Sequence, residues 1–138
     1  MTDLEILKEL NFENEQLKKS FKLIVKRHGY MLSYGTKSLK NDKEIVLCAV
    51  KKDGLALEFA SEELKKDEEV ILAAIKQNEY ALHYISDELK NDKKLMLKAV
   101  KENGFILRLL NRDLQHDKDI VNMAIKSIYR NLDVECDI

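Results

Sequence analysis

The chain has 138 residues, of which 36% are charged and 45% are apolar, with no proline and a net charge of −1. This length suits one domain, and the near-zero net charge gives no field that favours nucleic acid or an anionic membrane. No apolar run approaches the roughly 20 residues that span a bilayer, and the start, MTDLEILKEL, lacks the pattern of a secretory leader. We expect a cytoplasmic protein with reduced cysteines and no membrane partner.

Residues 1–25 differ from the rest of the chain and are predicted to form N-terminal capping helices. Thr2 and Glu5 have the spacing of a capping box for a first helix. Asn14 is expected to cap a second, longer helix. The apolar residues of these two helices are Leu4, Ile6, Leu7 and Leu10, followed by Leu17, Phe21, Ile24 and Val25.

From Lys26 onward the sequence repeats every 25 residues without a gap. The four sequence units are residues 26–50, 51–75, 76–100 and 101–125, and the places within each are called unit positions 1 to 25. Five unit positions are identical in all four units: Lys at 1, Leu at 7, Leu at 14, Asp at 17 and Ala at 24. Self-similarity at a fixed period of this size indicates a helical-repeat architecture.

Each unit is predicted to contain two short helices. The first spans about unit positions 5 to 11, and the second follows the Asp at unit position 17, which suits an N-cap. The second helix is predicted to end at the glycine of unit position 4, in the left-handed conformation. That glycine is present in three units and replaced by Glu79 in the third. The alanine at unit position 24 indicates a point where helices approach closely.

Short helices of this kind are stable only when they stack on their neighbours. We therefore predict an all-α fold, a right-handed α-solenoid or helical-repeat array of four two-helix units with capping helices at both ends. The last helix is expected to continue over residues 126–132, and residues 133–138 are expected to form a tail.

Two phrases of the sequence carry a resemblance to a known family. They are ALEFASEELKKDEEVILAAI over residues 56–75 and ALHYISDELKNDKKLMLKAV over residues 81–100. They resemble the short helical repeats of the family catalogued as domain of unknown function 4116, over about residues 26–125. The resemblance implies an array of small helices and no catalytic residues. Gly35, Glu79 and Asn122 depart from the pattern.

No group of residues has the pattern of a catalytic or metal site. His28, His83 and His116 occupy different unit positions, and no zinc motif such as His-Glu-x-x-His occurs. The aspartates at unit position 17 are interpreted as helix caps, and the lysines at unit position 1 as complements to the helix dipole. We expect no enzyme activity, no cofactor and no metal.

The variable unit positions are the better candidates for function. Unit positions 8 and 12 lie four apart, so they are predicted to share one face of the first helix, and they change from acidic to basic along the array. Tyrosines at unit position 9 are expected to lie mostly in the core, with their hydroxyl ends in water. The candidate partner-binding surface comprises Tyr34, Lys37, Glu58, Glu62, His83, Tyr84, Asp87, Arg108 and Arg112.

The leading hypothesis is a non-enzymatic helical-repeat protein that binds another protein, an inference from fold-level analogy. One alternative is a small inhibitor or immunity-type protein that acts on a toxin or a defence nuclease. Another is an RNA-binding repeat protein, and an enzyme would require a deep pocket with converging ionisable groups. The basic residues available for RNA are Lys26, Arg27, Lys37, Lys40 and Lys43.

Overall fold

A computed structural model describes the backbone of residues 2–132, without the side chains of residue 4 and residues 6–13. The described chain is helical throughout and has no strand, so the fold is all-α. The predicted tail at residues 133–138 lies outside the described residues. In chain order, with η for 3₁₀ helices, the elements are α1 (Asp3–Arg27), η1 (Gly29–Tyr34), α2 (Lys37–Lys40), α3 (Lys43–Lys52), η2 (Gly54–Phe59), η3 (Leu64–Lys66), α4 (Glu68–Gln77), η4 (Glu79–Tyr84), α5 (Asp87–Lys90), α6 (Lys93–Glu102), η5 (Gly104–Leu109), α7 (Arg112–Gln115) and α8 (Lys118–Leu132).

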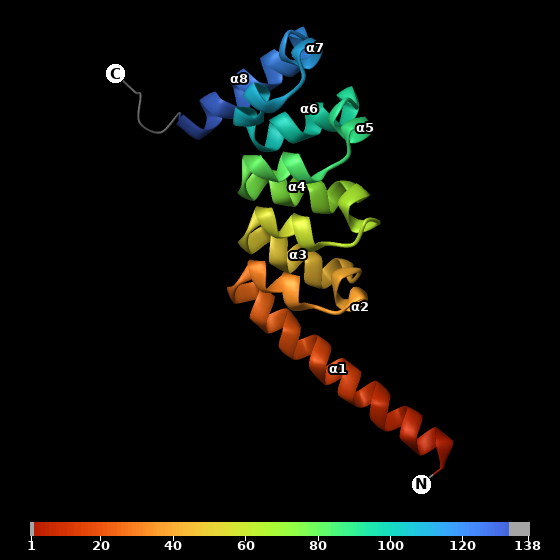
Figure 1. The fold of residues 1–138 in the computed structure, drawn as a ribbon. Helices are drawn as coiled ribbons and strands as arrows, with labels where there is room; N and C mark the ends of the chain where they lie inside the picture. The colour runs from red at the N-terminus through yellow and green to blue at the C-terminus, as the bar shows by residue number, and fades with distance from the viewer. Residues whose placement is uncertain (1, 133–138) are drawn as a thin grey trace.

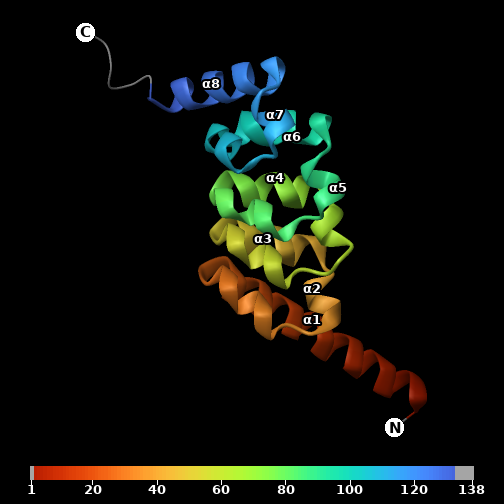
Figure 2. The same cartoon turned by 45° about the horizontal axis from the view of Figure 1, so that its top comes forward.

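The elements stack in chain order, so that each long helix lies beside the preceding and following ones (Figure 1). Helix α1 stands at one end of the stack and α8 at the other, as the turned view in Figure 2 also shows. The N-terminal half of α1 projects beyond the stack (Figure 1).

Helix α1 is one continuous helix, and the prediction of two helices in this region was wrong. The capping box is confirmed: the Thr2 N–H donates to Glu5 Oε2 at 2.8 Å, and the Glu5 N–H donates to Thr2 Oγ1 at 3.3 Å. Asn14 lies inside the helix and caps nothing. An interior asparagine costs less than about 1 kcal/mol relative to alanine, and α1 contains no glycine or proline that would interrupt it.

The sequence units contain three helical segments each, where two were predicted. The predicted first helix is a six-residue 3₁₀ helix that ends at unit position 9, and two extended residues follow it. A single helical turn comes next, and then the long α-helix. The long helices α3, α4, α6 and α8 begin at residues 43, 68, 93 and 118, that is, 25 residues apart.

Short polar side chains explain these boundaries, because each accepts a hydrogen bond from a first-turn N–H group. The predicted aspartate caps are confirmed: in α4, for example, Asp67 Oδ1 accepts from the Val70 N–H at 3.2 Å. The same geometry recurs at unit position 17 in every unit. The single turns are capped at unit position 11 by Thr36, Ser61, Ser86 and Asn111, and three of the 3₁₀ helices at unit position 3 by Asp53, Asn78 and Asn103.

The glycines at unit position 4 allow a close approach of backbones, and the prediction of left-handed glycines was wrong. No described residue has a positive φ. A Cβ atom at Gly29 or Gly54 would lie 2.3 Å from the carbonyl oxygen of Ala49 or Ala74 respectively. Gly104 has the same relation to Ala124, at 2.5 Å. Each 3₁₀ helix is thereby packed onto the last turn of the long helix 20 residues later.

The third unit is built differently because Glu79 carries a side chain where the other units have glycine. Helices η1, η2 and η5 each pack against the long helix of their own unit. Helix η4 packs instead against η2 and α4 of the preceding unit, without extensive contact to α6. The Glu79 carboxylate forms an ion pair with Arg108 on η5.

We expect Gly54→Ala to lower the free energy of unfolding by about 1–3 kcal/mol, the usual cost of overpacking. The new Cβ would meet the Ala74 carbonyl oxygen, which is backbone and has no room to move away. In a helix without this contact the same substitution would stabilise by about 1 kcal/mol. Urea denaturation followed by circular dichroism measures the change.

Glu79→Ala is the matched control, since that site already carries a Cβ atom. It removes an exposed ion pair and is expected to cost about 1 kcal/mol or less. A Gly54→Ala variant as stable as the wild type would refute the close-approach explanation.

Candidate interaction surface

The nine candidate surface residues lie on two separate sets of elements. Those of unit positions 8 and 9 are on the 3₁₀ helices, and those of unit position 12 begin the following single turns. The extended residues between them, such as Ala60 with φ −69° and ψ 158°, break the helix. The expected common face of unit positions 8 and 12 was therefore wrong. The 3₁₀ helices carry Tyr34, Glu58, His83, Tyr84 and Arg108, and the turns carry Lys37, Glu62, Asp87 and Arg112.

On the 3₁₀ helices, residues three apart lie on the same side, because a 3₁₀ helix has three residues per turn. His83 accordingly stacks on Tyr80, with 6.0 Å between the ring centroids. From the next unit, the Arg108 guanidinium lies 5.5 Å from the centroid of the same Tyr80 ring. Arg108 also pairs with Glu79 and donates to the Tyr80 hydroxyl at 3.4 Å, so much of its hydrogen-bonding capacity is already used.

Glu58 and Tyr84 come from successive units and lie near each other. Partial burial raises the pKa of the Tyr84 phenol, and the negative charge of Glu58 raises it further. Tyr84 packs against the core, as predicted for most of its ring. Glu58 is exposed and forms no ion pair with any described residue, so it presents a free negative charge.

Three of the tyrosines predicted to lie mostly in the core are instead widely exposed. The exposed fractions are 77% for Tyr34, 54% for Tyr30 and 44% for Tyr80. Phe105, which the sequence reasoning did not select, is 49% exposed at the same unit position as Tyr30 and Tyr80. The apolar character of unit position 5 in all four units was the signal for this row, but it was interpreted as core.

The single turns form an edge with open grooves between successive units. Glu62 of one turn faces His83 and Tyr84 across a groove of about 190 Å³. Lys37 lines a groove of about 460 Å³, and Asp87 one of about 410 Å³. Arg112 is exposed on α7. The grooves lie between neighbouring turns and share no set of converging ionisable groups.

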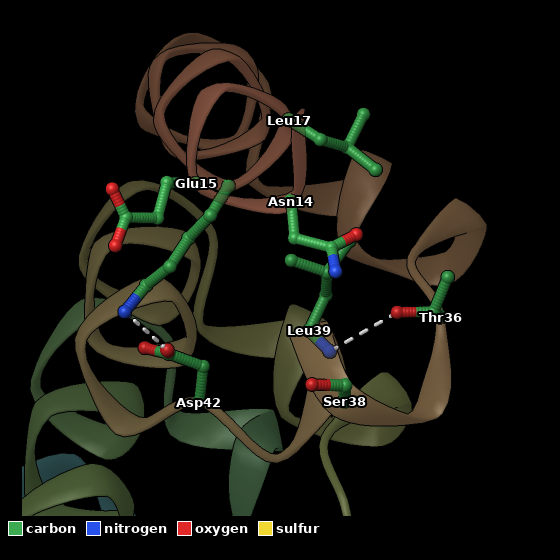
Figure 3. A pocket seen from close by; sticks show the side chains of 8 residues that line it. Asn14, Glu15, Leu17, Thr36, Ser38, Leu39 and Asp42 are labelled. Carbon is green, nitrogen blue, oxygen red and sulfur yellow. Dashed lines mark hydrogen bonds and ion pairs between the residues drawn. The ribbon is translucent and has the colours of Figure 1, made fainter. Parts of the chain in front are cut away.

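Figure 3 shows the first groove of this edge, between α1 and α2, with a volume of about 440 Å³. Asp42 lies on one side of it and Thr36 on the other (Figure 3). Asp42 pairs with Lys18 at 2.7 Å, and Thr36 accepts from the Leu39 N–H at 3.3 Å. The polar groups of this groove are thus occupied in holding α1 and α2 in place.

Lysines join the start of one long helix to the cap of the next. Lys43 contacts Asp67 at 3.1 Å and Glu69 at 2.9 Å. Lys93 contacts Asp117 and Asp119, each at 3.0 Å. Of the basic residues proposed to bind RNA, Lys43 is therefore engaged within the chain.

The remaining chemically active side chains form no site. The three histidines are exposed at separate places. Within the described residues there is no group of three His, Cys, Asp or Glu side chains that could hold a metal ion. Cys48 is free, and Cys136 lies outside the described part of the chain. Among the described helices, none has the length and apolarity needed to cross a membrane.

The fold defines an all-α protein built of stacked short helices, with exposed aromatic side chains on its 3₁₀ helices. The model of the family described as Domain of unknown function (DUF4116) matches residues 21–65, 67–114 and 92–134. The chain belongs to this family, as the resemblance in its repeated phrases implied. Comparison with curated proteins and with solved structures gave no significant match.

The lysine–aspartate pairs lead to a prediction about acid stability. Burial alone would raise the pKa of Asp67, but the hydrogen bonds from the Val70 N–H and from Lys43 outweigh it and lower the pKa. A group with a lowered folded-state pKa contributes stability above its unfolded pKa, near 3.9, and loses it as the pH falls through the folded value. We expect the free energy of unfolding to decrease below about pH 4, and Asp67→Asn to weaken this dependence.

Asp92→Asn is the matched control for this prediction. Asp92 caps α6 in the same way, but Glu68 occupies the place that corresponds to Lys43, so Asp92 has no such lysine partner. Asparagine also caps helices, so both variants keep the cap, and only Asp67→Asn is expected to lose up to about 1 kcal/mol at pH 7. Urea titrations between pH 2 and about 7 measure the difference, and identical pH profiles for the two variants would count against the lysine contribution.

Proposed function

We propose that this chain is a right-handed α-solenoid of four 25-residue units that binds another protein through its 3₁₀ face and has no enzymatic activity. The 3₁₀ face is defined as the exposed side chains of η1, η2, η4 and η5. Its members are Tyr30, Tyr34, Glu58, Tyr80, His83, Phe105 and Arg108. The equal 25-residue spacing of the long helices supports the repeat architecture.

The exposed aromatic side chains carry this proposal. Exposed tyrosine and phenylalanine in a row are typical of protein interfaces, since a large ring supplies contact area with little loss of side-chain entropy. Here they are 44% to 77% exposed, although the other apolar positions of the same helices, such as Leu57 and Ile106, are fully buried. No structural requirement of the stack explains their exposure.

The charges of the face favour a partner with a basic segment. Glu58 is unpaired among the described residues, and the second unit has four basic and seven acidic residues, a net charge of −3. Arg108 above the Tyr80 ring shows, within the chain itself, how a guanidinium group binds to this face. A lysine or arginine of the partner would make the same contact with Tyr30 or Tyr34.

These charges also weigh against RNA as the principal ligand. Lys43 is paired with Asp67 and Glu69, and the free charge on the 3₁₀ face is negative at Glu58. The inhibitor or immunity-type hypothesis is a special case of protein binding. It would be supported by a stoichiometric partner that is an enzyme and loses its activity in the complex.

The test uses Tyr34→Ala and Glu58→Lys, two substitutions of exposed side chains that leave the core intact. A photo-crosslinking residue at position 30 captures partners in native lysate, and quantitative mass spectrometry compares the variants with the wild type. We expect a specific protein whose recovery falls at least about tenfold in both variants, because interface hot spots contribute about 2 kcal/mol or more.

Lys66→Glu, an exposed substitution on the opposite side of the same unit's short turn, serves as the control and is expected to retain the partner. Capture that is equal in all variants would argue against the 3₁₀ face. Recovery of RNA with an affinity that falls steeply with salt would favour the RNA alternative.

A further inference from the structure

Helix α8 carries a stripe of apolar side chains that nothing in the described structure covers. Ile125, Tyr129 and Leu132 are 58%, 66% and 57% exposed. They lie four and three residues apart, so they share one side of the helix, and the half-buried Val121 continues the stripe towards the start of α8. An uncovered stripe of this kind marks an interaction surface.

The repeat shows what such a stripe does elsewhere in the chain. Ile125 occupies unit position 25, and at this position Val50, Ile75 and Val100 have an exposed fraction of 0%. In each of those cases the following unit packs against the long helix. The outer side of α8 is therefore the surface that a following helical unit would bury.

The other end of the stack also exposes large apolar side chains. On α1, Phe21 and Val25 are buried in the contact with the first unit, whereas Leu17, Leu23 and Ile24 are 56%, 65% and 42% exposed. Helix α1 thus has one side packed against the stack and a partly apolar side that faces outward. It has the character of a helix to which another layer can be added.

The two ends have opposite charge. Residues 3–17 of α1 contain five acidic and one basic residue, a net charge of −4. Helix α8 contains three basic residues and one acidic residue, a net charge of +2, and Lys126 and Arg130 are exposed beside its apolar stripe. Because α1 and α8 lie at opposite ends of the molecule (Figure 1), one molecule cannot bring them together.

We propose that a second copy of this chain covers α8, with the outward side of α1 of one copy packed against the Ile125–Tyr129–Leu132 stripe of the other. This head-to-tail contact buries the exposed apolar side chains of both ends and pairs their opposite charges. A tail-to-tail dimer would place Lys126 and Arg130 against their own copies and leave α1 uncovered. A head-to-tail contact does not close on itself, so it generates chains of increasing length with concentration. The inference is independent of the proposed function.

The experiment combines two variants that each lack one end. The tail variant is Ile125→Glu with Tyr129→Glu, and the head variant is Leu17→Glu with Ile24→Glu. All four side chains are exposed, and circular dichroism confirms that each variant keeps its helical content. Size-exclusion chromatography with light scattering measures the mass from about 1 μM to about 1 mM, the range of weak to moderate affinities.

We expect the wild-type mass to rise with concentration and each variant alone to remain a monomer. Mixed in equal amounts, the two variants should form a dimer and nothing larger, because one retains the tail and the other the head. The exposed Lys66→Glu substitution, which also adds negative charge, should associate like the wild type. A wild-type monomer at every concentration, a head variant that still dimerises, or a mixture that stays monomeric would each overturn the proposal.

Discussion

The close approach between a glycine and a carbonyl oxygen sets the geometry on which the other features of this chain depend. In three units, the absence of a side chain at unit position 4 lets the 3₁₀ helix rest on the last turn of its long helix, at the alanine of unit position 24. Both residues must be small, and both are fully or nearly buried. With the 3₁₀ helix held at this distance, unit positions 6 and 7 face the core and unit positions 5 and 8 face outward. The exposed aromatic rows therefore follow from the glycine contact.

Capping side chains supply the second constraint, since the chain has no proline to end its helices. Three polar side chains per unit satisfy the first-turn N–H groups of three helical segments, and the extended residues between segments let the chain reverse direction within 25 residues. Lysine–aspartate pairs then join one cap to the long helix before it. The cap aspartates thus act in two ways, within their own helix and between neighbouring helices.

The 25-residue period, the all-α class and the aspartate caps were predictable because they depend on identities between units. The 3₁₀ geometry was not, because over six residues the apolar positions fit a period of 3.0 as well as 3.6. Asn14 was misread as a cap since its residue type is equally compatible with a helix interior next to strong helix formers. The candidate surface was predicted in part: Tyr34 and Glu58 are exposed as expected, but the engagement of Arg108 by Glu79 joins residues 29 positions apart, which no local pattern shows.

Glu79 has a consequence for how the whole molecule loses its structure. In a repeat protein, each unit is stabilised by its own contacts and by its interfaces with neighbours, so cooperativity is transmitted from unit to unit. At Glu79, the 3₁₀ helix belongs by its contacts to the preceding unit, and its link to α6 is reduced. The coupling between residues 29–84 and residues 93–132 therefore rests on the packing of α4 against α6 and on the Arg108 contacts. One glutamate thus divides a continuous stack into two blocks whose unfolding need not coincide.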